Sequence, residues 1–230
     1  MTRIKVCGLR EVEHALLAAD LGADYLGAIC WPVSKRYATR EQLRAIAYEL
    51  RCRYDYQRRP LLVGVFVNQP ADEIAEVADV CGLDLVQLHG DEPWDAWEAM
   101  PVPVIRALRV PADRHPLDLI GELYRETPDL LAAGGRVLIE SLVAGQYGGT
   151  GQTANWGLAA EVARHHQFLL SGGLTPENVA TAIRGVRPWG VDVSSGVETD
   201  GAKDMTKIRA FIEAVRAADA ALTAVAPATR

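Results

Sequence analysis

The feature that most constrains the fold is a regular alternation of short apolar runs with segments whose apolar residues recur at helical spacing. Continuous apolar runs are typical of parallel strands covered on both faces, because neither face meets water. Eight such units follow one another without a change in composition. The pattern predicts an α/β fold, a single (β/α)8 TIM barrel over residues 1–218, and a C-terminal tail at 219–230 that frays. The expected strands are residues 3–7, 25–29, 61–67, 83–88, 102–108, 136–140, 167–171 and 190–194.

A doubly wound open sheet is the competing architecture for a chain of 230 residues. Such a sheet usually binds phosphate in the turn after its first strand, through a characteristic glycine spacing. The residues Cys7-Gly8-Leu9, which end the first expected strand, lack that spacing. The closed barrel is therefore favoured.

Capping residues indicate where two of the helices begin. Thr39 is expected to cap a helix that runs to about Leu50, and the basic segment at 51–59 is expected to be a solvated loop. Thr175, followed directly by proline, is expected to cap the helix after the seventh strand.

Two glycine-bearing stretches near the C-terminus, SGGLTPENV and VDVSSGVE, each follow an expected strand. Glycines let backbone N–H groups approach an anion closely, and a helix N-terminus attracts negative charge. Paired loops after the last two strands form the recurrent phosphate site of (β/α)8 enzymes, and two ordinary turns are the alternative. We predict a site for a phosphorylated small molecule at Gly172, Gly173, Ser195 and Gly196.

The carboxyl ends of barrel strands carry the reactive side chains of such enzymes. Cys7 and Glu140 lie at two of these ends and can form a base and acid pair, although Cys7 is equally well explained as a small buried hydrophobe. A glutamate that ends a buried strand needs a partner or a raised pKa. Arg36 is a candidate ligand for a second anionic group, or a solvated arginine. His89 is either a hydrogen-bond donor at the open end of the barrel, where the strands end, or a residue of the barrel wall whose hydrogen bonds are satisfied within the protein. The second interpretation is favoured.

Strand alternation places Lys5 and Cys7 on one face of the first strand, and Asp192 and Ser194 on one face of the last. The first and last strands are neighbours in a closed barrel. We therefore predict that Lys5 pairs with Asp192 inside the barrel and has a structural role.

Composition excludes several classes of protein. A net charge of −6 and a pI near 5.4 argue against a nucleic-acid partner. The N-terminus lacks the apolar core of a signal peptide, and no apolar run approaches the roughly 18 residues of a membrane span, so a cytoplasmic protein without membrane association is expected. The cysteines are too scattered for a zinc site or a disulfide framework, so we expect free thiols and no metal: Cys7, Cys30, Cys52 and Cys81.

Eight motifs occur in a single order along nearly the whole chain: KVCGLR, GADYLGAI, SKRY, VGVFVN, VQLHGDE, GGTG, LSGGLTPENV and VDVSSGVETDGAKD. They resemble the phosphoribosylanthranilate isomerase family of tryptophan biosynthesis. The resemblance implies an Amadori rearrangement of N-(5'-phosphoribosyl)anthranilate to 1-(2-carboxyphenylamino)-1-deoxyribulose 5-phosphate, with no metal and no organic cofactor. It leaves open whether the chain is a monomer or a homodimer.

The family pattern, carried over by position, implies roles for the candidate residues. Cys7 would be the general base that removes the C2' proton, and Arg36 would bind the anthranilate carboxylate. The two glycine loops would hold the phosphate. At the end of the sixth strand the family has an aspartate as general acid, whereas this chain has Glu140, whose arm is longer by one methylene.

Two other functions fit the same residues. A relaxed-specificity isomerase would also accept the related histidine-pathway aminoaldose, but that chemistry is usually run by two aspartates and the first strand here ends in Cys7. A non-catalytic sugar-phosphate-binding barrel would tolerate Glu140 but would not need a base.

Overall fold

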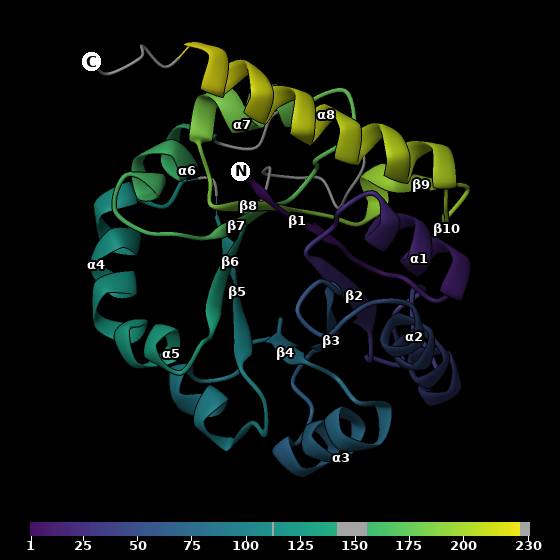
Figure 1. The fold of residues 1–230 in the computed structure, drawn as a ribbon. Coiled ribbons are helices and arrows are strands. Elements are labelled where there is room, and N and C mark those ends of the chain that lie inside the picture. The colour runs from purple at the N-terminus through teal and green to yellow at the C-terminus, as the bar shows by residue number, and fades with distance from the viewer. Residues whose placement is uncertain (112, 142–155, 226–230) are drawn as a thin grey trace.

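Eight short strands pair in chain order and close into a parallel barrel, because the first strand also pairs with the last. The computed structural model describes residues 1–111, 113–141 and 156–225 (Figure 1). The predicted TIM barrel is confirmed. The strands are β1 (Arg3–Val6), β2 (Tyr25–Ile29), β3 (Leu61–Phe66), β4 (Leu85–Leu88), β5 (Val104–Val110), β6 (Arg136–Ser141), β7 (Leu169–Ser171) and β8 (Gly190–Val193).

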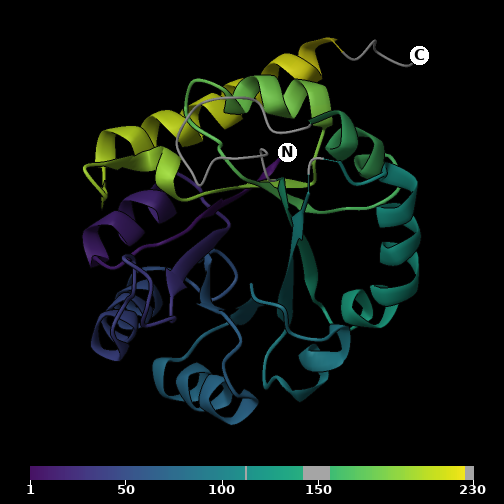
Figure 2. The same ribbon diagram turned by 180° about the vertical axis from the view of Figure 1, so that it is seen from behind.

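Helices surround the strands on the outside, as views from opposite sides show (Figure 1, Figure 2). The last helix packs against both the first and the one before it, so the outer ring closes where the strands close. The helices are α1 (Val12–Asp20), α2 (Arg40–Arg53), α3 (Ala71–Cys81), α4 (Pro116–Glu126), α5 (Pro128–Ala132), α6 (Trp156–Ala163), α7 (Val179–Val186) and α8 (Met205–Val225), with the 3-10 turns η1 (Trp94–Ala99) and η2 (Ser195–Val197).

The core has two parts, because successive side chains of a strand point to opposite faces. A larger apolar cluster fills the space between strands and helices. A smaller cluster fills the inside of the barrel and comprises Tyr25, Val63, Leu85, Ile105, Ala107, Leu138 and Leu169. Burial of both faces explains why the strands read as unbroken apolar runs in the sequence.

The start of α2 is as predicted. The Thr39 hydroxyl accepts a hydrogen bond from the Gln42 N–H, and the Gln42 side chain accepts one from the Thr39 N–H, which makes a complete capping box. The end is later than expected. Because α2 continues to Arg53, the first residues of the segment 51–59 are helical rather than part of a loop.

The predicted cap of α7 is wrong, since the helix begins at Val179 and not after Thr175. The Asn178 side chain bonds back to the preceding loop: its Oδ1 accepts from the Thr175 N–H at 2.8 Å, and its Nδ2 donates to the Gly173 carbonyl at 2.9 Å. An asparagine that bonds to nearby backbone in this way favours a turn over a helix. Residues 175–178 therefore form a turn that fixes the loop after β7.

The expected fraying of residues 219–230 is not seen in the part of the tail that is described. Helix α8 runs to Val225, and residues 226–230 lie outside the described chain. Asp219 accepts hydrogen bonds from the Thr2 backbone N–H at 2.9 Å and from its hydroxyl at 2.6 Å. Arg216 donates to the Thr2 carbonyl at 2.8 Å. These bonds tie the last helix to the start of β1.

A small antiparallel hairpin between β8 and α8 has no counterpart in the sequence prediction. Its strands, β9 (Glu198–Thr199) and β10 (Ala202–Lys203), have two residues each, too short for a periodicity signal. Asp200 and Gly201 turn the chain with φ angles of 53° and 79°, as expected of an Asp-Gly turn. The pairing sets Glu198 directly opposite Lys203.

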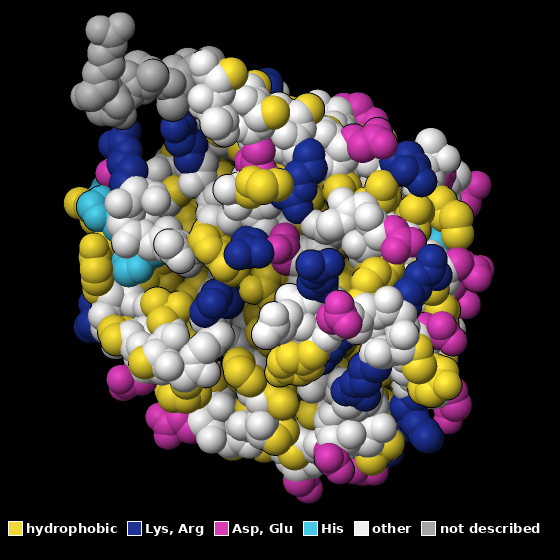
Figure 3. All heavy atoms as spheres, viewed as in Figure 1, with side chains coloured by type: hydrophobic (Ala, Val, Ile, Leu, Met, Phe, Trp, Pro, Cys, Tyr) yellow, Lys and Arg dark blue, Asp and Glu magenta, His cyan; other side chains and the backbone are white. Residues whose placement is uncertain are grey.

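The surface mixes the two signs of charge. On the face drawn in Figure 3, Lys and Arg side chains are interspersed with Asp and Glu and form no continuous basic band. No helix among the described residues is both long enough and apolar enough to span a bilayer.

Candidate functional site

Lys5, Cys7 and Asp192 lie together inside the barrel where β1 meets β8. The Lys5 Nζ lies 2.8 Å from Asp192 Oδ1, and the two residues are in register across the strand pair. Both side chains are buried, which confirms the predicted pairing. Burial opposes the charge on Lys5, but the negative charges of Asp192 and Cys7 together raise its pKa above the ordinary value. An ammonium held charged in this way is not a nucleophile.

Cys7 is a buried free thiol directly after β1. Burial raises its pKa, because the thiolate loses its hydration, and the positive charges of Lys5 and Lys203 oppose that rise. Gly27 on β2 makes room for this group. A Cβ at Gly27 would lie 2.8 Å from the Cys7 sulfur and 3.1 Å from the Lys5 Nζ.

Glu140 lies near the end of β6 and is held by a chain of hydrogen bonds from β4. His89 Nε2 lies 3.2 Å from Glu140 Oε2, and Gln87 Nε2 lies 2.7 Å from His89 Nδ1. An amide nitrogen only donates, so Nδ1 accepts and Nε2 carries the hydrogen that points to Glu140. His89 thus positions the candidate acid, with about a quarter of each side chain exposed (24% and 28%).

The free protein favours the ionised form of Glu140. The hydrogen bond from His89 lowers the Glu140 pKa most, burial works against this, and the charge of Arg109 lowers it further. Arg109 is in register with Glu140 across β5 and β6 and pairs with Asp91 at the surface. The carboxylate therefore has a partner, as a glutamate at the end of a buried strand requires.

Arg36 forms a two-pronged ion pair within the protein. Its Nε donates to Glu198 Oε1 at 2.6 Å, and its Nη2 donates to Glu198 Oε2 at 2.8 Å. The Lys203 Nζ also reaches Glu198 Oε1, at 2.7 Å, and donates to the Ser194 carbonyl at 2.8 Å. The hydrogen bond to Glu198 raises the pKa of Arg36, so the guanidinium is charged.

The two glycine loops face one another across a small pocket after β7 and β8. Gly172 and Gly173 have φ angles of 100° and 65°, a backbone conformation that residues other than glycine rarely adopt. A Cβ at Gly196 would collide with the Leu174 carbonyl, so η2 lies directly against the other loop. The pocket has a volume of about 260 Å³ and is lined by Gly173, Leu174, Thr175, Glu177, Ser195, Gly196, Glu198 and Lys207. Three of the predicted phosphate ligands therefore share one pocket, and Gly172 adjoins it.

Sequence analysis missed Glu198, Lys203 and Lys207. All three lie in or just after the motif VDVSSGVETDGAKD. Periodicity cannot indicate a hairpin whose strands have only two residues each. The Asp-Gly dipeptide was the available signal, because it brings flanking residues together. The predicted glycine-dense loop, residues 142–155 with its GGTG motif, lies outside the described residues.

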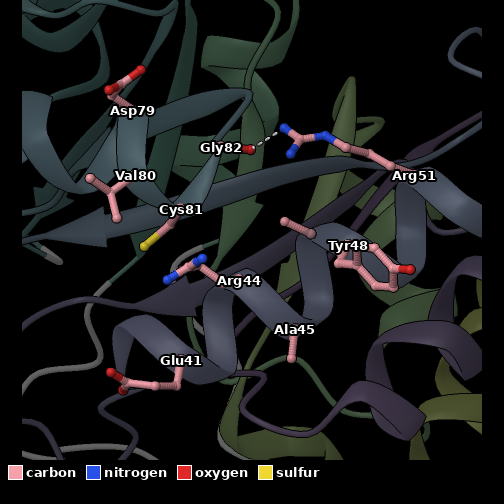
Figure 4. Close-up of a pocket in the computed structure, with 10 residues that line it drawn as sticks. Glu41, Arg44, Ala45, Tyr48, Arg51, Asp79, Val80, Cys81 and Gly82 are labelled. Atoms are coloured by element: carbon pink, nitrogen blue, oxygen red, sulfur yellow. Dashed lines mark hydrogen bonds between the residues drawn. The ribbon is translucent and has the colours of Figure 1, made fainter.

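A larger groove on the outer surface, about 550 Å³, lies between α2 and the end of α3 (Figure 4). Arg51 crosses this groove and donates to the Gly82 carbonyl at 2.8 Å. None of the residues that line it comes from a strand end, so it does not belong to the barrel mouth. Among the described residues no three His, Cys, Asp or Glu side chains are grouped as a metal site requires.

Comparison with known proteins supplies the family. The model of the N-(5'-phosphoribosyl)anthranilate (PRA) isomerase family matches residues 4–214. The chain belongs to the PRA isomerase family. A relative named N-(5'-phosphoribosyl)anthranilate isomerase, from Roseiflexus sp. strain RS-1, is 46% identical over 220 residues, which are 95% of this chain and 99% of the relative. The chain is thus an isomerase of tryptophan biosynthesis.

Solved PRA isomerases have the same barrel. The Thermotoga maritima enzyme is 37% identical, with a TM-score of 0.79 over 94% of this chain and 100% of that one. A second PRA isomerase structure, 35% identical with a TM-score of 0.76 over 94% of this chain and 100% of that one, holds reduced 1-(o-carboxyphenylamino)-1-deoxyribulose 5-phosphate. That bound molecule carries a phosphate and an aryl carboxylate.

Proposed function

We propose that this chain converts N-(5'-phosphoribosyl)anthranilate to 1-(2-carboxyphenylamino)-1-deoxyribulose 5-phosphate, with Glu140 as general acid and Cys7 as general base. The observation that carries the proposal is the placement of a carboxyl group and a thiol at one barrel mouth, with an arginine on one side and a glycine-lined pocket on another. The substrate has one carboxylate and one phosphate, and these two sites suit them.

The first step opens the sugar ring. Glu140 protonates the ring oxygen, the bond from that oxygen to C1' breaks, and the lone pair of the anilino nitrogen forms a C1'=N double bond. The resulting iminium withdraws electrons from C2'. This makes the C2' proton acidic enough for a weak base.

The second step moves that proton. The Cys7 thiolate takes the proton from C2', and the C–H electron pair forms a C1'=C2' double bond while the iminium nitrogen regains its lone pair. The enol then ketonises: C1' gains a proton, and the C2' hydroxyl loses one to become the carbonyl. No atom is gained or lost overall, and no oxidant is needed. Lys5 and Lys203 favour the thiolate that begins this step.

Glu140 must carry a proton before it can give one. In the free protein His89 holds its pKa below the ordinary value of 4.5. The bound substrate displaces water and places a carboxylate and a phosphate nearby, and both changes raise the pKa of a carboxyl group. We therefore infer that substrate binding is what makes Glu140 an acid.

The test is the loss of anthranilate-type fluorescence when purified protein meets freshly generated N-(5'-phosphoribosyl)anthranilate. Turnover should fall by about 10²–10⁴-fold in Cys7→Ala and in Glu140→Gln, the usual contribution of a general base or acid. Cys52→Ala, which removes an exposed thiol on α2, is the matched control and should keep full activity.

The family assignment argues against a barrel that binds the sugar phosphate without catalysis, the alternative that Glu140 allows because it is longer than the family's aspartate. The signature of such a barrel would be an inactive parent in which Glu140→Asp restores turnover. Activity in the parent that survives better in Glu140→Asp than in Glu140→Gln would exclude it, because only aspartate can still carry the proton.

A further inference from the structure

We propose that Glu198 is a positioning residue, which holds Arg36 in place for the carboxylate of the substrate and Lys203 in place beside the Cys7 thiol. Its own carboxylate has no role in proton transfer. The part of the proposal that concerns substrate rests on the proposed function. The part that concerns the two cations rests on the geometry alone.

The Glu198 carboxylate is buried and fully used. Its side chain is 7% exposed, and it meets Arg36 through both oxygens and Lys203 through one of them. Burial alone would raise the Glu198 pKa, but the hydrogen bonds from Arg36 and Lys203 outweigh burial and bring the net pKa below its ordinary value of 4.5. Such a group is a fixed anion, suited to holding cations.

Glu198 decides which edge of Arg36 faces the substrate. A guanidinium can grip a carboxylate with two parallel N–H bonds along its Nε–Nη2 edge or along its Nη1–Nη2 edge. Glu198 occupies the first edge. Among the hydrogen bonds of the described residues none uses Arg36 Nη1, and the side chain is 34% exposed. The outer edge is therefore the one presented to the substrate's carboxylate.

Glu198 also fixes Lys203 beside the catalytic thiol. The Lys203 side chain is 4% exposed, and its ammonium is shared between Glu198 and Ser194. A Cβ on Gly8, the residue after Cys7, would lie 3.2 Å from the Lys203 Nζ. Burial lowers the Lys203 pKa more than the hydrogen bond and charge of Glu198 raise it, and the positive charge of Arg36 lowers it further. Without Glu198 this buried ammonium would lose its anion.

The backbone of Glu198 holds a third cation. Lys207 donates from its Nζ to the Glu198 carbonyl at 2.7 Å and lines the same pocket as Gly173 and Gly196. One residue therefore connects the arginine for the carboxylate with the pocket for the phosphate. This connection fixes the distance between the two anion sites, which the length of the substrate must match.

The negative charge of Glu198, considered alone, predicts that this residue weakens substrate binding, whereas a positioning role predicts that it strengthens binding. A carboxylate beside an anion site repels the ligand, so its removal should strengthen binding. Glu177 lines the same pocket and bonds to Thr175, with no hydrogen bond to Arg36 or Lys203 among the described residues. The variants Glu198→Gln and Glu177→Gln remove the same charge from one pocket.

We expect Glu198→Gln to raise KM at least tenfold with a smaller change in kcat, whereas Glu177→Gln, which removes only the repulsion of an anion, lowers KM. In an Arg36→Met background, Glu198→Gln should add little to KM, since the two residues act together. A KM that falls in Glu198→Gln would overturn the proposal. Should that variant not fold, Glu198→Asp keeps the charge and shortens the arm: a raised KM then supports positioning, and an unchanged KM refutes it.

A second readout needs no substrate. Reductive methylation of Lys203, followed by peptide mass spectrometry, should be slow in the parent, several-fold faster in Glu198→Gln and unchanged in Glu177→Gln. Equal labelling in all three proteins would refute the positioning of Lys203. If the parent does not turn over N-(5'-phosphoribosyl)anthranilate, the proposed function fails, and the labelling alone decides the role of Glu198.

Discussion

Lys5 and Asp192 are partners at two levels: their Cα atoms are in register across β1 and β8, and the Lys5 Nζ lies 2.8 Å from Asp192 Oδ1. The Ser171 hydroxyl donates to the other Asp192 oxygen at 3.0 Å. The pair therefore joins β1, β7 and β8 from inside the barrel. A buried ion pair of this kind adds little net stability, but it is costly to break.

Asp192→Asn should destabilise the protein by about 3–5 kcal/mol, because Lys5 would be left as a buried charge without an anion. Urea unfolding measures the loss. Glu76→Gln removes the partner of Arg40 in an exposed pair and should cost far less, because water screens such a pair. An equal, small cost in both variants would mean that the internal pair is not needed.

Gly27→Ala should displace Cys7, since the added methyl carbon would lie 2.8 Å from its sulfur. We expect a destabilisation of about 1–3 kcal/mol, typical of overpacking, and a loss of isomerase activity larger than the loss of stability explains. Gly185→Ala is the control: that glycine is in α7 with nothing within 4 Å of the added carbon. It should stabilise the helix by about 0.5–1 kcal/mol. Full activity in Gly27→Ala would contradict the crowding.

Reaction of Cys7 with iodoacetamide should rise about tenfold per pH unit and should not level off below pH 9, its ordinary pKa, because burial raises the thiol pKa despite Lys5 and Lys203. Peptide mass spectrometry separates Cys7 from the other thiols. Isomerase activity should change little over the same range, because each gain in Cys7 thiolate is offset by a loss of the protonated Glu140 that the first step needs. Labelling that levels off near neutral pH would show that the two lysines outweigh burial.

Stability should fall in acid partly through Glu198. Its folded pKa lies below the ordinary value of 4.5, so its contribution is present above pH 4.5 and is lost as the pH falls through the folded pKa. Thermal unfolding at pH 7 and at pH 4 should therefore show a larger drop in midpoint for the parent than for Glu198→Gln. Equal drops would mean that the carboxylate is not held by its cations.

The barrel was predictable because its signal is repeated. Each buried strand must be apolar on both faces, and the alternation with amphipathic helices leaves few other architectures. The Lys5–Asp192 pair was predictable for the same reason, since strand alternation and barrel closure together place the two side chains. Position after an expected strand, rather than periodicity, singled out Arg36 and the phosphate loops, and the motif resemblance then implied their roles.

Other features could not be predicted from the sequence, because they depend on contacts that periodicity does not record. Thr175 has the residue type of a helix cap, but the Asn178 side chain bonds to the Thr175 N–H, and α7 begins only at Val179. Helix α8 extends beyond the predicted end because Asp219 bonds to Thr2, which is distant in the sequence. An alanine-rich segment gives no indication of such a contact. That Arg36 would meet a carboxylate of the protein itself depends on a hairpin too short to predict.

The ties between Arg36 and Glu198 and between Thr2 and Asp219 join residues 162 and 217 positions apart. Both cross the seam at which β8 meets β1. Contacts of such long separation form late, because the whole intervening chain must first be gathered. During synthesis Cys7 therefore emerges well before Glu198 and Lys203, which we propose are positioned around it. On the proposed roles of these residues, the site is complete only once β8 has paired with β1.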